Sequence, residues 1–412
     1  MSHSARLSDY RTALTTPGAG VPALMSVLGR MPIAMVGLSL LLYVQRETGS
    51  FAVAGLVSAG SLVGVATGAV VQGRIMDRRG PTRPLLAIVG LFAAAVVAVV
   101  IAVETGQPAV VLVLLGGVVG LTEPMVGAAS RSLWTYLLPP GPIRHAAYAY
   151  EAISLEVFFI LGPALAGVLV VAPWAGTGLL AGAICMVVGS IGFALAPAVR
   201  AVRPTPDDSP RDLLGALASP GMRTVALAAF GFGITVGFVE VAVPAAATQA
   251  GHAPLGGLML AMWSLTSVVF GLFYAIRPWP RPMSQRMPAL LGVFSLLIAP
   301  LSIPTSLLGL AVALLFAGVW ITPQSTAHTT VIEYVALPGT ATEAFGWVIT
   351  SVTLGLAAGH STSGYLVEHV GVPSAFLASS VAGLLIAALV WSRRGTVPDH
   401  APEPAPVAVA AR

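Results

Sequence analysis

The stretch GRIMDRRGPTRPLL, residues 73–86, contains most of the features that predict the fold of this chain. It joins two apolar runs, 51–73 and 84–103, and concentrates one aspartate and four arginines between them. Gly73 and Gly80 permit close approach and a tight turn, and Asp77 can face a helix N-terminus or an arginine. Arginines collect at the inner surface of membranes, so the segment is predicted to be a short loop between two membrane-spanning helices.

The composition of the whole chain supports a membrane protein. Of 412 residues, 56% are hydrophobic and only 9% are charged, whereas soluble domains carry about 25% charged residues. This composition excludes a soluble enzyme, a disordered chain and a nucleic-acid binder. Cys185 is the only cysteine, so no disulfide within the chain is possible.

Twelve apolar runs are long enough to cross a bilayer, which takes roughly 20 residues as a helix. They lie at 20–44, 51–73, 84–103, 108–133, 146–171, 176–197, 221–246, 254–276, 287–303, 306–328, 344–367 and 372–392. Their length and their lack of alternation exclude the strands of a membrane β-barrel. The predicted fold class is therefore an all-α membrane protein with twelve transmembrane helices.

Arginine placement predicts the orientation. All 20 basic residues are arginines, and the net charge is +4. If the N-terminus is cytoplasmic, eighteen arginines lie on the cytoplasmic side, Arg46 lies outside and Arg30 falls inside the first run. This positive-inside bias predicts a multi-pass protein of the plasma membrane, surrounded by the lipid bilayer, with both termini in the cytoplasm.

The longest hydrophilic stretch, 198–220, divides the chain into halves. It predicts two six-helix bundles, 20–197 and 221–392, joined by a cytoplasmic linker, as in transporters with a substrate site at the midplane. The remaining segments are a cytoplasmic N-terminal segment, 1–19, and a tail, 393–412, whose Pro-rich and Ala-rich composition predicts disorder.

The loop at 73–86 resembles the signature loop of the major facilitator superfamily, roughly G-x-x-x-D-R-x-G-x-R. Gly73, Asp77, Arg78, Gly80 and Arg83 match it in place. Together with the twelve runs, this identifies the chain as a member of the superfamily over about residues 15–395, most like a bacterial twelve-helix efflux protein. The resemblance implies two bundles that rock around a cavity lined by the first, fourth, fifth, seventh, tenth and eleventh helices.

The resemblance also implies that the loop is a latch between the bundles. The expected partners are Arg131, at the inner end of the fourth run, and Glu343, which starts the eleventh. Thr340 and Glu343 also form a capping-box pattern, so Glu343 is either a latch residue bound to Arg78 or Arg79, or only a cap.

A second resemblance lies in GPALAG, residues 162–167. It is similar to the G-P-x-x-G-G element of antiporters in the superfamily, which mostly export. Gly162, Pro163 and Gly167 match the element, whereas Ala166 replaces a glycine. The alternative is ordinary glycine and proline packing in a membrane helix. The arginine that proton-coupled drug exporters carry early in the fourth helix is replaced here by Leu112.

Ionisable side chains inside the runs are the candidate functional residues, because charge at membrane depth is costly and usually functional. They are Arg30, Glu123, Glu151, Glu156, Glu240, His328 and His360. Glu123 or Glu156 is the expected partner of Arg30, and Glu151 is expected to pair with Arg144, seven residues before it. Glu156, Glu240 and His360 are candidates for proton coupling, although a fixed structural network is the open alternative.

These features predict a secondary transporter that exports a small organic molecule, such as a drug or metabolite, in exchange for protons. The open alternatives are a proton-coupled importer or a facilitator of a sugar or other metabolite, a non-transporting receptor on the same fold, and a membrane-embedded enzyme. The chain has no phosphate-binding loop, no metal-ligand spacing and no nucleophile motif. We therefore expect no enzymatic activity, catalytic residue, metal, cofactor or nucleic-acid partner, and a monomer.

Overall fold

The computed structural model describes residues 7–139, 141–202, 215–276, 281–336 and 341–398. Within these ranges the secondary structure is helical. The helices are α1 (Leu7–Thr15), α2 (Gly20–Arg30), α3 (Ile33–Thr48), α4 (Phe51–Arg79), α5 (Thr82–Glu104), α6 (Ala109–Thr122), α7 (Val126–Leu137), α8 (Pro142–Leu169), α9 (Thr177–Leu195), α10 (Pro197–Ala201), α11 (Pro220–Gln249), α12 (Pro254–Ile276), α13 (Met283–Ile298), α14 (Leu307–Gly318), α15 (Ile321–Val335), α16 (Ala341–His369) and α17 (Val372–Ser392). Three 3₁₀ turns, at Ala216–Ala218, Ala299–Ser302 and Arg394–Thr396, complete this set.

These helices make twelve membrane spans. Eleven segments of the described chain are long and apolar enough to cross a membrane. The twelfth span is α16, a helix of 29 residues. It is more polar than the others because it carries His360, Glu368 and several serines and threonines. The prediction of an all-α membrane protein with twelve spans is therefore confirmed.

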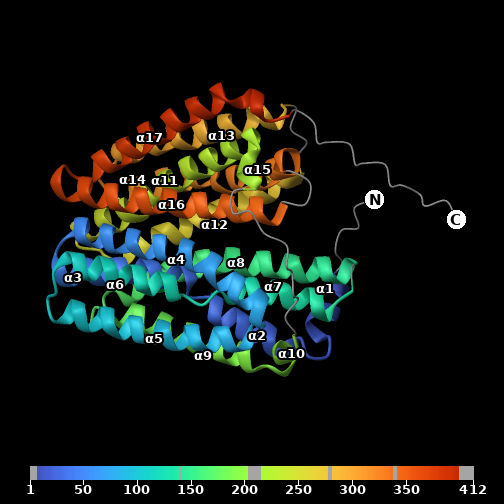
Figure 1. The fold of residues 1–412 in the computed structure, drawn as a ribbon. Helices are drawn as coiled ribbons and strands as arrows, with labels where there is room; N and C mark the ends of the chain where they lie inside the picture. The colour runs from blue at the N-terminus through green and yellow to red at the C-terminus, as the bar shows by residue number, and fades with distance from the viewer. Residues whose placement is uncertain (1–6, 140, 203–214, 277–280, 337–340, 399–412) are drawn as a thin grey trace.

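The spans form two halves that lie side by side (Figure 1). The first half contains α2 to α9 and the second contains α11 to α17. The main contacts between the halves pair α4 with α16 and α8 with α12. We call these two contacts the α4–α16 seam and the α8–α12 seam.

The two ends of the bundle differ in charge. At one end lie the turns at 49–50, 105–108, 170–176, 250–253, 303–306 and 370–371, on the left of Figure 1. This is the arginine-poor end, where Arg46 donates to the carbonyl oxygens of Val170 and Ala172 and so caps α8. The opposite, arginine-rich end carries Arg78, Arg79 and Arg83 on exposed positions.

Three of the predicted spans are not single helices. The first is interrupted at Met31 and Pro32, the fourth at residues 123–125, and the tenth at Val319 and Trp320. Pro32 and Pro124 lack the N–H that would continue a helix, and a proline also restricts the residue before it. The fourth span, predicted at 108–133, therefore crosses the membrane as two helices, α6 and α7, that meet at Pro124.

Candidate functional site

The α4–α16 seam is built from two antiparallel helices whose contacting residues keep one register. Phe51, Gly55 and Ser58 of α4 lie opposite Glu368, Gly364 and His360 of α16 in antiparallel order, all at helical spacings of three or four. A Cβ atom on Gly55 would overlap the carbonyl oxygen of His360 and lie 3.2 Å from the Cα of Gly364. The two glycines therefore let the backbones of the two halves touch.

A chain of hydrogen bonds crosses this seam near its deeper end. The hydroxyl of Ser58 lies 2.7 Å from Nδ1 of His360. Nε2 of the same imidazole lies 2.8 Å from Oε2 of Glu240, on α11. His360 is therefore bound on both ring nitrogens, once within its own half and once to the other half. The structure brings together two predicted site residues, Glu240 and His360, with Ser58, which the sequence did not single out.

A carboxylate closes the same seam at the arginine-poor end. Oε2 of Glu368 accepts hydrogen bonds from the hydroxyl of Ser50 at 2.5 Å and from the amide of Ala52 at 2.8 Å. Glu368 thus caps the N-terminus of α4 from the other half, where the helix dipole favours negative charge.

The α8–α12 seam contains the GPALAG element. A Cβ atom on Gly257 of α12 would overlap the carbonyl oxygen of Pro163 and lie 2.7 Å from the Cα of Gly167. Gly162 faces the other way, because a Cβ atom there would lie 2.9 Å from the amide nitrogen of Met35 on α3. Pro163 and Gly167 therefore contact the opposite half, and Gly162 packs within its own half.

Glu156 lies on the face of α8 that turns toward the second half. It precedes Pro163 by seven residues and Gly167 by eleven, spacings that put all three on one side of a helix. Its side chain is exposed and makes no hydrogen bond or ion pair with the described residues. Glu156 is therefore a carboxyl group without a partner among the described residues, on the inter-half face of α8 and about 10 Å along the helix axis from Pro163.

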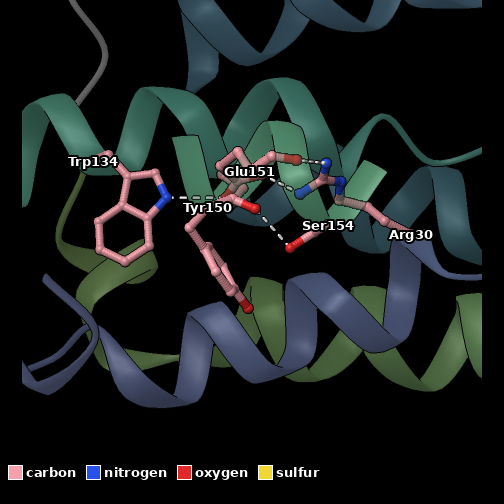
Figure 2. A network of polar contacts seen from close by, with 6 residues as sticks. Arg30, Trp134, Tyr150, Glu151 and Ser154 are labelled. Atoms are coloured by element: carbon pink, nitrogen blue, oxygen red, sulfur yellow. Dashed lines mark hydrogen bonds and ion pairs between the residues drawn. The ribbon is translucent and has the colours of Figure 1, made fainter. Parts of the chain in front are cut away.

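The first half holds a buried ion pair between Arg30 of α2 and Glu151 of α8 (Figure 2). Arg30 is 5% exposed and Glu151 is 1% exposed. Oε1 of Glu151 also accepts from the hydroxyl of Ser130 at 2.6 Å and from Nε1 of Trp134 at 2.9 Å, both on α7. The Arg30 guanidinium lies 5.6 Å from the ring centre of Phe158. Both charges are thus paired and bonded, as buried ions require.

This pairing corrects two expectations. Arg30 does not pair with Glu123 or Glu156, and Glu151 does not pair with Arg144, because Glu151 faces inward from α8 toward the end of α2. Glu156 lies five residues further along α8, on the side of the helix that faces α12. Glu123 sits in the break between α6 and α7, where its carboxyl group makes no hydrogen bond or ion pair with the described residues.

His328 and the aromatic residues form a core in the second half. Nε2 of His328 lies 2.8 Å from Nε2 of Gln324, one turn earlier on α15, and its ring packs edge-on against Phe232 at 5.7 Å. Trp263 stacks on Phe294. Because all of these side chains are buried, they pack the interior of this half.

The signature loop is only partly described. Gly80 follows the last residue of α4 with a φ of 75°, a conformation that favours glycine. A Cβ atom on Gly73 would meet none of the described atoms within 4 Å, so Gly73 makes no close contact in this conformation. Arg131 is exposed on α7. The side chains of Asp77 and Glu343 lie outside the described residues, so the predicted latch stays a prediction.

Sequence reasoning missed several residues that the structure places at these sites. Ser50, Ser58, Gln72, Ser130, Trp134 and Glu368 bind the predicted residues or cap the helices beside them. Gln72 could have been found, because an amide in an apolar run needs a partner. Serines are too common in membrane helices to give a comparable signal.

Comparisons with known proteins agree with this architecture. The sequence matches the family model described as Major Facilitator Superfamily over residues 23–342. No curated protein matches the sequence.

Three solved structures illustrate the shared fold. The nucleoside transporter NupG has a TM-score of 0.70 at 12% identity, covering 90% of this chain and 98% of that one. A bacterial homologue of the iron transporter ferroportin, in an inward-facing state, has a TM-score of 0.69 at 14% identity, covering 94% and 99%. A bacterial homologue of the human lysosomal transporter Spinster, inward-facing and unoccupied, has a TM-score of 0.65 at 15% identity, covering 97% and 100%.

At these identities the solved structures show the fold alone. The family match, however, spans well over half of the chain, and it agrees with the signature loop and the twelve spans. This chain belongs to the major facilitator superfamily.

Proposed function

We propose that this protein is a secondary transporter that exports a small organic molecule in exchange for protons by alternating access. The observation that carries the proposal is the chain Ser58–His360–Glu240, which joins the two halves through groups that can bind protons. Histidine and carboxylate side chains form the proton relays of many pumps and transporters. A proton bound here therefore changes a contact that must break for the halves to separate.

The coupling follows from the hydrogen-bonding capacity of the imidazole. A neutral His360 donates through one ring nitrogen and accepts through the other, which suits an ionised Glu240 and the Ser58 hydroxyl together. When Glu240 takes up a proton, the acceptor of the Nε2 hydrogen bond loses its charge and the bond weakens. His360 then holds Ser58 less firmly, and the α4–α16 seam can open.

The orientation supports a direction for this cycle. Because most arginines lie at one end, we place that end in the cytoplasm and the protein in the plasma membrane, with both termini inside. Both seams are closed toward the arginine-poor end, which in this orientation is the outer end. The described conformation is then the inward-facing one, ready to take substrate from the cytoplasm.

Export is favoured by the position of the antiporter-like element. Its Pro163 and Gly167 contact Gly257 of the other half, so the element lies where the halves must part. Glu156, on the same face of α8, presents toward the second half a carboxyl group that no described residue binds. This group suits a neutral or cationic, partly apolar substrate.

The test is transport by the purified protein in lipid vesicles with an imposed pH gradient, using a panel of organic cations, antibiotics, sugars and amino acids. We expect Glu240→Gln and His360→Gln to abolish acceleration by the gradient while leaving exchange of substrate across the membrane. Glu47→Gln, at an exposed position of the arginine-poor end, is the control and should behave as wild type.

Two outcomes would contradict the proposal. Full proton-driven transport in both variants would show that Glu240 and His360 do not couple the cycle. Movement of the substrate in the same direction as the protons would indicate symport instead of export.

A further inference from the structure

The fourth span is interrupted between α6 and α7, at membrane depth. α6 ends at Thr122, and Glu123 leaves the helical region with φ −58° and ψ 121° before Pro124. α7 then begins at Val126. A break at membrane depth exposes backbone groups that water cannot satisfy in the bilayer, so the protein must supply partners for them.

Gln72 of α4 supplies those partners. Its side-chain amide donates to the carbonyl oxygens of Leu121 at 3.1 Å and Glu123 at 2.8 Å. Its Oε1 accepts from the amide of Met125 at 3.1 Å. Gln72 is 2% exposed, so one buried side chain bonds both sides of the break.

The Glu123 carboxyl group receives none of this support. Glu123 is 6% exposed, and none of the described residues donates to its carboxyl group or pairs with it. The Met125 amide, which could have stabilised negative charge at the start of α7, is bonded to Gln72 instead.

The charged groups of the neighbouring helices do not compensate Glu123 either. Arg30 of α2 lies against Gly127 of α7, but it is bound to Glu151 of α8. The other charges on the helices packed around the break are at helix ends or exposed positions: Arg83 and Glu104 of α5, Arg131 of α7, Arg74, Arg78 and Arg79 of α4, and Arg144 and Glu156 of α8. Asp77 of α4 has a side chain outside the described residues.

We infer that Glu123 is a proton-binding site and carries its proton in the described conformation. A buried carboxylate without a partner is too costly to remain ionised, so a cation must accompany it. A metal cation requires several oxygen ligands, but the carbonyl oxygens at the break already accept from Gln72. A proton needs only the carboxylate itself.

The position of Gln72 links this site to the α4–α16 seam. Gln72 and Ser58 lie on the same continuous helix, 14 residues apart, or roughly 21 Å along its axis. The helix that contacts the second half at Ser58 therefore also bonds the break beside Glu123 through Gln72. The inference rests on the proposed exchange of protons for substrate, and it adds a second proton site in the first half.

Infrared spectroscopy of the purified full-length protein tests this directly, because a protonated carboxyl group has a carbonyl stretch that a carboxylate lacks. We expect this band at neutral pH in the wild type, its loss in Glu123→Gln, and its retention in Glu104→Gln. Glu104 is a matched control, since it accepts from Tyr43 and Trp174 far from the break. An unchanged spectrum in a folded Glu123→Gln variant would overturn the assignment.

A second variant, at Gln72, tests the same site by favouring the ionised form of Glu123. Gln72→Leu frees the Met125 amide to bond the Glu123 carboxylate, so the band should disappear at a lower pH than in the wild type. The same midpoint in both proteins would contradict this account of the site. The infrared spectrum is recorded without transport, so it tests the proton on Glu123 separately from the proposed function. The band can be present even if the protein does not export in exchange for protons, and proton-coupled export can be correct even if the band is absent.

Discussion

At the scale of single residues, the described part of the chain holds two kinds of buried acid: one that is paired with a base, and one that has no partner among the described residues. Glu151 is bonded by Arg30, Ser130 and Trp134, whereas Glu123 has no such partner among the described residues. The first arrangement is a fixed network that joins α2, α7 and α8. The second leaves a group that can change its charge, and only such a group can carry a proton through a transport cycle.

The Arg30–Glu151 pair makes a prediction about stability. Arg30→Met leaves Glu151 buried without its partner, which should destabilise the fold by about 3–5 kcal/mol. The double variant Arg30→Met with Glu151→Met replaces both ions by apolar side chains of similar length and should recover much of this loss. The measurement is the midpoint of thermal unfolding in detergent. Equal midpoints for the wild type and the single variant would show that the pair is not structural.

At the scale of elements, glycine contacts set how closely the halves approach. Gly55 faces α16 from α4, and Gly257 faces Pro163 and Gly167 from α12. Seams without side chains between the backbones can close fully and also separate without breaking many specific contacts. The polar residues Ser50, Ser58 and Glu368 then decide how firmly the α4–α16 seam stays closed.

Gly257→Val should therefore force the α8–α12 seam open. The new side chain would overlap the Pro163 carbonyl oxygen, and overpacking costs about 1–3 kcal/mol. A cost of this size shifts a two-state equilibrium roughly 5- to 150-fold, here toward separation at the arginine-poor end.

The distance between spin labels at Gln107 and Thr305, both exposed at that end, measures the shift. The background lacks Cys185. Gly90→Ala is the control, because a Cβ atom there meets none of the described atoms within 4 Å. A distance distribution in Gly257→Val that matches this control would show that the seam is not tight.

At the scale of the whole molecule, both seams are closed at the arginine-poor end, and Glu368 acts where the two halves meet the surface. Its effect on the equilibrium between conformations has a definite pH dependence. Because the closed state bonds the carboxylate of Glu368 through Ser50 and Ala52, its stabilisation is present where Glu368 is ionised and is lost where acid protonates it.

Glu368→Gln should therefore favour opening of the arginine-poor end at neutral pH, where the wild-type carboxylate is ionised. In acid strong enough to protonate Glu368 the two proteins should behave alike, because the wild-type group is then uncharged. The same label pair at Gln107 and Thr305 reports this comparison. A difference between the proteins that persists in strong acid would show that the charge of Glu368 is not what holds the seam.

The sequence allowed us to predict the fold class, the twelve spans and the family, because hydrophobic length and arginine placement are local properties and the signature loop is contiguous. It also identified nearly all the charged residues at membrane depth. It could not pair them: Arg30 and Glu151 are 121 positions apart, and Ser58 and His360 are 302 apart.

The packing of the helices determines which acids are neutralised, which helix face meets the other half and where the fourth span breaks beside Gln72. The physical reason is that burial and partnership depend on how helices rotate and pack against one another. Many neighbouring side chains set that packing jointly, and no short stretch of sequence encodes it.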